Sequence, residues 1–463
     1  MAVKALVDPG HALGPGLAAI RAQFEVPAAF PPEVLAAAEE AAQRAPTAHV
    51  DRTDRPFVTL DPASSTDLDQ AFAIERAGAD LLFHYAIADV AWFVDDGGLI
   101  EAEAWRRGET QYLPDAKANL YPPVLSEHAA SLLPDGPRPA VVFTVRVDPE
   151  GAVRLDGVER AVIRSRAKLA YETVTPADLP PDFGELSDRI SAAEQKRGAA
   201  RVDPPEQEVE ALGDGRFRLS FRPRLESEDR NASLSLATNM AVAAALQAHS
   251  TGLFRVMAEP DARAIQRLRN TAHAFGLDWS ATASLKDFER SLDAADPRHA
   301  AFMFAVRRAG NGAGYAPWQQ GVTPWHSAVA ATYAHATAPL RRLADRYVIR
   351  AALAVVNGEP VPPVVENAFS RLPPVMARAE SLAGRIERAV IDYAEAVMLQ
   401  DHLGEVMAAV ATDIDERGAR IQLRDLPVVA RVDAHHVAPG QTLQVRLDAV
   451  DPDQRTIRFA RVS

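Results

Sequence analysis

The sequence predicts an α+β protein: a large domain with a mixed sheet and helices, followed by a small all-β barrel. Apolar runs of strand length dominate residues 55–162, and Ala-, Leu- and Arg-rich patterns of helix length dominate residues 232–402. Short alternating segments then fill 403–463, and a chain of 463 residues is too long for one ordinary core. We therefore expect a short helical leader over 1–50, a large domain over 51–402 and a small barrel over 403–463.

The leader and the first half of the large domain follow from helix-start and strand patterns. Pro31 and Pro32 precede the Ala-rich stretch VLAAAEEAAQ, so a short helix is expected to begin at a proline. After Arg55, four apolar runs bounded by Asp, Gly and Pro are expected to form strands, with the helical stretch IEAEAWRRG interrupting them. The expected strands are FVTL, AFAIE, LLFHYAIADVAWFV and AVVFTVRVD.

The second half of the large domain is expected to be mainly helical, and the tail to be a barrel. Helix-length patterns cover residues 232–250, 342–357 and 375–402. After Gly404, Gly, Pro and Asp turns join five segments: VMAAVATDI, ARIQLRD, VVARVDA, TLQVRLDAV and TIRFARV. Five short strands in a segment of this length predict a small closed barrel such as an OB fold.

The composition excludes several classes of protein. Without cysteine the chain has neither disulfides nor thiolate ligands, so Asp, Glu and the 12 His are the possible ligands and any metal should be a hard one. No apolar run reaches the length of a membrane span, and the N-terminus lacks the apolar core of a secretory signal. A net charge of -13 argues against non-specific coating of nucleic acid but is compatible with a local basic channel. We expect a cytoplasmic monomer with no membrane attachment and no organic cofactor.

Three carboxylates lie close together in the segment DPASSTDLDQ, which leaves a predicted strand. Asp61, Asp67 and Asp69 occupy a stretch rich in turn-forming residues, where their side chains can converge. A set of oxygen ligands suits magnesium or manganese, and such sites commonly bind the metal together with substrate phosphates. The loop predicts phosphoryl-transfer chemistry, and an Asp-rich turn in solvent is the alternative.

A second group of residues suits a phosphate. In TYAHATAPLRRLAD, Pro339 precedes Arg341 and Arg342 at the expected start of a helix. A guanidinium can hold a phosphate through two parallel hydrogen bonds, and the backbone amides at a helix start also favour anions. The pair predicts a phosphate contact, and solvent-facing arginines at a helix start are the alternative.

Taken together, four segments resemble the ordered motifs of the ribonuclease II (RNB) family. They are RPFVTLDPASSTDLDQAFAIE, FHYAIADVAWFVDDGGLIEAEAWRRGETQYLPD, VIRSRAKLAYETV and TYAHATAPLRRLADRYV. The leader resembles the segment before the family's catalytic domain, and the tail resembles its C-terminal RNA-binding OB fold of the S-one type. The resemblance implies an RNB-type catalytic domain over 51–402, in a short form without the N-terminal cold-shock domains of longer members. It also implies a magnesium-dependent 3′→5′ exoribonuclease that hydrolyses single-stranded RNA to nucleoside 5′-monophosphates.

The resemblance assigns roles to the acids and the arginines. Asp61, Asp67 and Asp69 match the family's metal-binding acids, and Asp69 holds the position on which the family depends most. Arg341 matches the arginine that contacts the scissile phosphate, with Arg342 next to it as a further RNA contact. Asp69 and Arg341 are thus the expected catalytic residues.

The resemblance also places RNA-binding residues farther along the chain. Tyr112 matches the aromatic residue that stacks on the terminal nucleotide, and Tyr171 matches a tyrosine near the ribose. Stacking tolerates any base, and contacts to the 2′-hydroxyl distinguish RNA from DNA. Glu387 falls where the family has a helical glutamate close to the active site, and a surface helix residue is the alternative.

The chain departs from the family's pattern at three positions. Gln70 stands where the family usually has a fourth acid, so we expect a neutral amide oxygen as ligand and a weaker second metal. Ser233 replaces a glutamate that is expected to act with Tyr171, which leaves selectivity for RNA over DNA open. Val202 occupies a position that is often aromatic, so the clamp opposite Tyr112 can be incomplete.

Two further functions remain open on the sequence. A catalytically silent RNA-binding protein would keep the channel and the barrel, and the loss of the fourth acid at Gln70 favours it. A metal-dependent phosphodiesterase acting on another nucleic acid, including single-stranded DNA, is the third possibility, and Ser233 favours that one.

Overall fold

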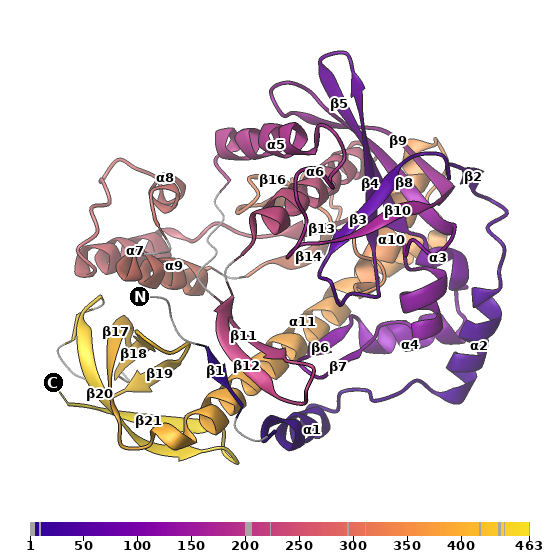
Figure 1. Cartoon of the computed structure of the whole chain (residues 1–463). Coiled ribbons are helices and arrows are strands. Elements are labelled where there is room, and N and C mark those ends of the chain that lie inside the picture. The colour runs from indigo at the N-terminus through magenta and orange to yellow at the C-terminus, as the bar shows by residue number, and fades with distance from the viewer. Residues whose placement is uncertain are drawn as a thin grey trace.

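A seven-stranded mixed sheet forms the centre of the large domain, and Figure 1 shows a closed barrel at the lower left, away from this sheet. This arrangement confirms the expected α+β class with a small barrel at the C-terminal end. The computed structural model describes most of the chain, and Val202 lies outside the described residues. They are residues 5–8, 11–199, 206–222, 224–293, 296–310, 312–415, 418–433, 437–438 and 440–462.

The seven-stranded sheet has an antiparallel centre and one parallel pair at each edge. Its strands, in spatial order, are β10 (Ser165–Ala170), β3 (Phe57–Asp61), β4 (Gln70–Ala77), β5 (Asp80–Ala88), β8 (Arg138–Val147), β9 (Val153–Ile163) and β2 (Val50–Asp51). The pairs β10–β3 and β2–β9 are parallel. The central strand β5 is buried over most of its length, which explains why it reads as a continuous apolar run.

One predicted strand is shorter than its apolar run. The sequence predicts a single strand over LLFHYAIADVAWFV, but β5 ends at Ala88 and a short helix, α3 (Val90–Phe93), follows. Between them lies Asp89, whose buried carboxylate accepts a hydrogen bond from Arg160 Nε at 2.8 Å and lies 3.1 Å from His49 Nε2. A buried, paired carboxylate ends the strand inside a run that hydrophobicity alone extends.

Helices cover the sheet and join it to the loops around it. Helix α6 packs on β8 and β9, and α10 packs on β9 and on α6. Helix α5 lies along α6, and α2 packs against α4 and a π-helical turn, η1. The bounds of these elements are α2 (Pro32–Ala42), α4 (Leu99–Arg107), η1 (Val124–Ala129), α5 (Phe183–Arg197), α6 (Glu226–Ala248) and α10 (Leu343–Val356). The helices expected at IEAEAWRRG, at 232–250 and at 342–357 are confirmed.

Helix α11 (Pro363–Met398) is the longest in the described part of the chain, and Figure 1 shows it running diagonally from the sheet to the barrel. The sequence predicts its start at residue 375, yet the helix continues through Pro373 and Pro374. Each proline removes a backbone donor, but Leu372 and Met376 on either side are fully buried in the main core. Tertiary packing thus overrides the local cost of the prolines.

The barrel closes in the order β17-β18-β19-β21-β20 and shares a second core with the C-terminal half of α11. The same core includes helix α1 and a three-stranded sheet, so α1 packs near the barrel while α2 packs in the main core. The leader is therefore divided between two cores. The bounds are α1 (Leu13–Gln23), β1 (Leu6–Val7), β11 (Glu206–Ala211), β12 (Phe217–Arg222), β17 (Val406–Asp415), β18 (Gly418–Leu423), β19 (Val429–Val432), β20 (Thr442–Asp451), β21 (Thr456–Arg461) and the 3-10 turn η2 (Gln400–His402).

The remaining elements are a small helical group with its own core and three two-stranded sheets. They are α7 (Ala262–Ala274), α8 (Leu285–Arg290), α9 (Pro297–Ala309), β6 (Gln111–Leu113), β7 (Ala116–Ala118), β13 (Leu253–Val256), β14 (Gly314–Pro317), β15 (Trp325–His326) and β16 (Ala331–Thr332). Within the described ranges, no helix has both the length and the apolar character that a bilayer crossing needs.

A buried carboxylate at the junction of α11 and the barrel gives a pH-dependent prediction. Glu395 Oε1 accepts from Val429 N at 2.9 Å and from Gln207 Nε2 at 2.6 Å, and burial raises the pKa of Glu395 to about 7. An unfolded glutamate loses its proton near pH 4.3, so the contribution of this group to stability is complete below that pH and is lost as pH rises toward 7.

The substitution Glu395→Gln should remove this pH dependence, because an amide oxygen can accept both hydrogen bonds without carrying a charge. We expect equal stability of the two proteins at pH 4 and an advantage of roughly 3 kcal/mol for the variant at pH 8. Chemical denaturation at the two pH values measures it, with Glu366→Gln on the exposed first turn of α11 as the control. Parallel pH profiles for Glu395→Gln and the unmodified protein would contradict the prediction.

Candidate active site

The acidic loop runs between β3 and β4 and is fixed by a buried serine from another part of the chain. Ser131 Oγ accepts from Leu68 N at 2.9 Å and donates to Thr66 O at 2.7 Å. Leu132 N donates to Leu68 O at 3.0 Å, and Leu68 itself is fully buried. The backbone of the loop is therefore pinned on both sides of Asp67.

Asp61 and Asp69 are the two deeply placed acids of this loop. Asp61 ends β3, and its Oδ2 is buried without a hydrogen-bond partner. Asp69 is 5% exposed, and it accepts from Leu340 N at 2.7 Å and lies 3.3 Å from Arg341 Nε. Burial raises the pKa of each carboxyl to about 7, against the opposing charge of Arg341.

Asp67 is held by a hairpin instead of by the loop. Its Oδ1 accepts from Lys117 Nζ at 2.8 Å, and its Oδ2 accepts from the Tyr112 hydroxyl at 3.2 Å. Both partners come from the β6–β7 hairpin. The charge of Asp67 also acts on Asp61 and Asp69, since it raises the pKa of both.

Both ends of the Gln70 amide are hydrogen-bonded to other parts of the protein. Its Oε1 accepts the hydroxyl of the fully buried Tyr85 and lies 3.2 Å from Ser235 Oγ, and its Nε2 donates to Thr337 O at 2.7 Å. A cation could take this oxygen only by displacing the tyrosine hydroxyl. The geometry therefore does not support the expectation that Gln70 supplies a metal ligand, because the amide is used to join β4, β5 and α6.

The acids fit a divalent cation in part. Over the described residues, no three Asp, Glu or His side chains form a group that could hold a metal ion as they stand. Asp61 Oδ2, however, is a buried carboxylate oxygen that has no hydrogen-bond partner. The charges of Arg341 and Asp67 act on both Asp61 and Asp69. A cation would compensate the burial that now raises the pKa of both groups. Asp61 and Asp69 are the residues that could hold one.

The paired arginines differ in their environments. The Arg341 side chain is 44% exposed and its Nε lies 3.3 Å from Asp69 Oδ2, so its charge is next to the acids and accessible from solvent. The Arg342 side chain turns inward, and its Nε and Nη2 donate to the two oxygens of Asp345 at 3.0 and 2.8 Å. Asp345 is fully buried and accepts two further backbone N–H groups, from Thr337 and Ala338. Arg342 is therefore engaged within the fold, and its predicted role as an RNA contact is not favoured.

The two predicted tyrosines contact different acids of the loop. Tyr112 is 54% exposed, and its hydroxyl is anchored on Asp67. Tyr171 follows β10, and its N–H donates to Asp61 O at 3.1 Å while its hydroxyl accepts from Asn231 Nδ2 at 2.8 Å. The structure thus brings both tyrosines to the loop. Their roles toward RNA stay predictions.

Ser233 and Glu387 are not part of this group. The Ser233 hydroxyl is buried and donates to Arg230 O at 2.6 Å within α6, so it is turned into its own helix. Asn231, two residues earlier, meets Tyr171 instead. Glu387 has an exposed side chain on α11, and its neighbour Ile386 packs in the core that α11 shares with the barrel. Its predicted place beside the active site stays a prediction.

The sequence did not predict Lys117, which contacts Asp67, or Asn231, which contacts Tyr171. Lys117 had a usable signal: Pro114 and Asp115 form the turn of a hairpin, and the turn places Lys117 opposite Tyr112. Asn231 had none, because it meets a tyrosine sixty positions away in the chain.

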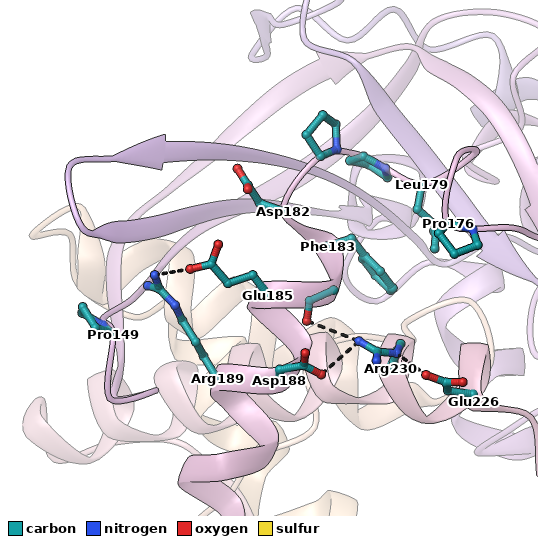
Figure 2. Close-up of a pocket in the computed structure, with 13 residues that line it drawn as sticks. Pro149, Pro176, Leu179, Asp182, Phe183, Glu185, Asp188, Arg189, Glu226 and Arg230 are labelled. Carbon is teal, nitrogen blue, oxygen red and sulfur yellow. Dashed lines mark hydrogen bonds and ion pairs between the residues drawn. The ribbon is translucent and has the colours of Figure 1, made fainter.

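A separate surface pocket of about 910 Å³ lies over α5 and α6, and Figure 2 shows its lining. Prolines from the loop after β10 form one wall, and the charged side chains are already paired. Arg189 Nη2 contacts Glu185 at 2.5 Å, and Arg230 contacts Glu226 at 2.8 Å and Asp188 at 3.0 Å. The described lining contains none of the predicted site residues, so the acidic loop remains the candidate active site.

Comparison with known proteins identifies two domains in this chain. The model of the RNB domain matches residues 49–358, and the model of the RNase II-type exonuclease C-terminal S1 domain matches residues 405–462. Ribonuclease R 1 of Lactococcus lactis subsp. lactis is 25% identical over 440 residues, which cover 88% of this chain and 53% of that relative. The chain thus spans about half the length of this curated relative.

Two solved structures share the fold. Mycoplasma genitalium RNase R, in complex with ribose methylated single-stranded RNA, superimposes with a TM-score of 0.84 at 20% identity, covering 96% of this chain and 78% of that one. Yeast Ssd1, a pseudonuclease, superimposes with a TM-score of 0.67 at 16% identity, covering 89% of this chain and 52% of that one. The fold therefore occurs both in a ribonuclease and in a pseudonuclease.

Proposed function

The chain belongs to the RNB-domain family, and from this premise we propose that it is a 3′→5′ exoribonuclease that hydrolyses single-stranded RNA to nucleoside 5′-monophosphates. One observation carries the proposal above all: two buried acids, Asp61 and Asp69, lie next to an exposed arginine, Arg341, at a pinned loop. Buried acids provide charge for a cation, and an exposed guanidinium provides a site for a phosphate.

Each residue has a role in this proposal that follows from its contacts. Arg341 binds the phosphate to be cleaved and stabilises the negative charge that develops on it, because its side chain is anchored on Asp69 and open to solvent. The exposed ring of Tyr112 stacks on the base at the 3′ end while its hydroxyl stays on Asp67. Tyr171, whose N–H donates to Asp61 O, contacts the ribose in this proposal, and Asn231 holds the Tyr171 hydroxyl.

Magnesium, or manganese in its place, is the cofactor that we propose. Asp61 and Asp69 are the residues that would hold it, since one has an unpartnered buried oxygen and the other a buried carboxylate. When bound, the cation supplies an activated water and neutralises charge at the reacting phosphate. The barrel is proposed as an outer RNA contact.

A second candidate is a protein that binds RNA without hydrolysing it. The observation that favours it is Gln70, which replaces a charge by an amide that is committed to Tyr85 and Thr337. The fold of Ssd1, a pseudonuclease, is compatible with such a protein. We favour hydrolysis because both deep acids, Arg341 and the two tyrosines are present together.

A digestion assay separates the candidates. Purified protein is incubated with a 5′-labelled single-stranded RNA and with a DNA of matched sequence, in magnesium or in manganese. Hydrolysis predicts an RNA shortened from its 3′ end and nucleoside 5′-monophosphates as products. RNA that is bound but left intact selects the silent binder, and equal digestion of the DNA selects a phosphodiesterase without preference for RNA.

A further inference from the structure

The ammonium group of Lys117 lies at the acidic loop with all three of its donors used. Lys117 Nζ contacts Asp67 Oδ1 at 2.8 Å, Glu127 Oε1 at 2.9 Å and Thr66 Oγ1 at 3.1 Å. An ammonium has three N–H donors, so this set of oxygens satisfies it completely. The side chain is 25% exposed, so Lys117 is largely buried and its ammonium is held by these three oxygens.

The positions of the partners show how this contact is held. Lys117 and Tyr112 are directly opposite each other in the β6–β7 hairpin, so both side chains lie on the same face and reach the two oxygens of Asp67. Glu127 comes from the π-helical turn η1, and Asn119 Nδ2 donates to its Oε1 at 2.8 Å. The β6–β7 hairpin thus supplies the positive charge next to Asp67, and η1 supplies a second carboxylate that holds the lysine in place.

This contact changes the number of charges that remain for a metal. Asp67 is paired with an ammonium, and Gln70 carries no charge and has its oxygen engaged by Tyr85. Within the described part of the chain, no lysine makes an ion pair with Asp61 or Asp69. Asp69 Oδ2 lies 3.3 Å from Nε of Arg341, a half-exposed arginine that is proposed to bind the phosphate, and Asp61 has an oxygen without a partner. Since affinity for divalent cations rises with the number of charged ligands, two carboxylates suit one ion better than two.

We propose that the Lys117 ammonium takes the place of a second metal ion at Asp67, so that the protein binds one divalent ion, on Asp61 and Asp69. A loop with four unpaired acids would suit two ions. Lys117 is a positioning residue in this account, because it acts through Asp67 and through the Tyr112 hydroxyl on the same carboxylate. The inference rests on the proposed function for the identity of the ion, but its test measures bound metal and not hydrolysis.

The test is a titration of the full chain with Mn²⁺, without RNA, in which electron paramagnetic resonance measures free and bound ion. We expect one bound ion per chain in the unmodified protein below about 1 mM free Mn²⁺, the weak end of protein sites for divalent cations. In Lys117→Met, which releases Asp67 and Glu127, we expect two. Lys117→Arg keeps the charge and should bind one ion.

Two further variants separate the release of a carboxylate from a general loss of positive charge. Lys168 Nζ donates to Ala63 O and Ser65 O, which are backbone carbonyls of the same loop, so Lys168→Met removes a charge but frees no acid. This variant should bind one ion. The double variant Lys117→Met with Asp67→Asn should return from two ions to one, and thermal melting checks that each variant is folded.

The outcomes are decisive in both directions. One ion in Lys117→Met, or two or none in the unmodified protein, would overturn the proposal. A change from one ion to two that depends on Asp67 supports it even if the protein digests no RNA, in which case the proposed function fails alone. Conversely, RNA digestion by a protein that binds two ions leaves the proposed function intact and removes this inference.

Discussion

Replacing Asp69 by Asn is expected to lower the rate of RNA hydrolysis by a factor of about 10³ while leaving RNA binding close to that of the unmodified protein. The amide oxygen of Asn can still accept the hydrogen bond from Leu340 N, so the loop keeps its position. What is lost is the charge next to Arg341 and to the proposed cation. Single-turnover hydrolysis and equilibrium binding of the same RNA measure the two quantities separately.

Stability provides an internal control for this substitution. Burial raises the pKa of Asp69 to about 7, so an ionised Asp69 at pH 8 costs free energy that an amide does not. The melting temperature of Asp69→Asn at pH 8 should therefore equal or exceed that of the unmodified protein. Asp178→Asn, in an exposed turn with Thr175, serves as the matched control and should retain full activity. Full activity in Asp69→Asn would show that the acidic loop is not the active site.

The neighbouring arginines should give opposite phenotypes. Arg341→Ala is expected to reduce kcat/KM by about 10²-fold or more, because it removes an exposed guanidinium from the phosphate site. Its melting temperature should change little, since Asp69 keeps its bond to Leu340 N. Arg341→Lys should recover part of the activity, because an ammonium keeps the charge but not the two-pronged geometry.

Arg342→Ala is the matched contrast. It leaves the fully buried Asp345 without its ion pair, which is expected to destabilise the protein by about 3 kcal/mol or more. Activity at low temperature should fall less than in Arg341→Ala. If Arg342→Ala lost activity without losing stability, then Arg342 would reach the RNA after all and the separation of the two arginines would be wrong.

The fold was predictable where a single pattern decides an element. The barrel strands alternate and are bounded by turn residues, and helices such as α4 and α10 follow from composition and spacing. The errors come from interactions that no local pattern encodes. The strand β5 ends early because Asp89 is paired across the sheet with Arg160, and α11 passes through Pro373 and Pro374 because the residues around them are packed in the core.

The candidate site was predictable as a set of chemical groups but not as a set of contacts. Spacing and resemblance identified Asp61, Asp67, Asp69 and Arg341, which the structure brings to one loop and its border. The same motifs could not show that Arg342 turns inward. Nor could they show that Lys117 pairs with Asp67, since the sequence does not reveal that the β6–β7 hairpin packs next to the acidic loop.

Hydrolysis at the acidic loop is tested by measuring the first turnover on RNA labelled in its terminal phosphodiester, together with the fraction of RNA bound. With magnesium, the protein should release the 3′-terminal nucleotide as a labelled 5′-monophosphate, and Asp69→Asn should bind the same RNA without releasing it. RNA that is fully bound by the unmodified protein and yields no monophosphate would show that the protein is not an exoribonuclease.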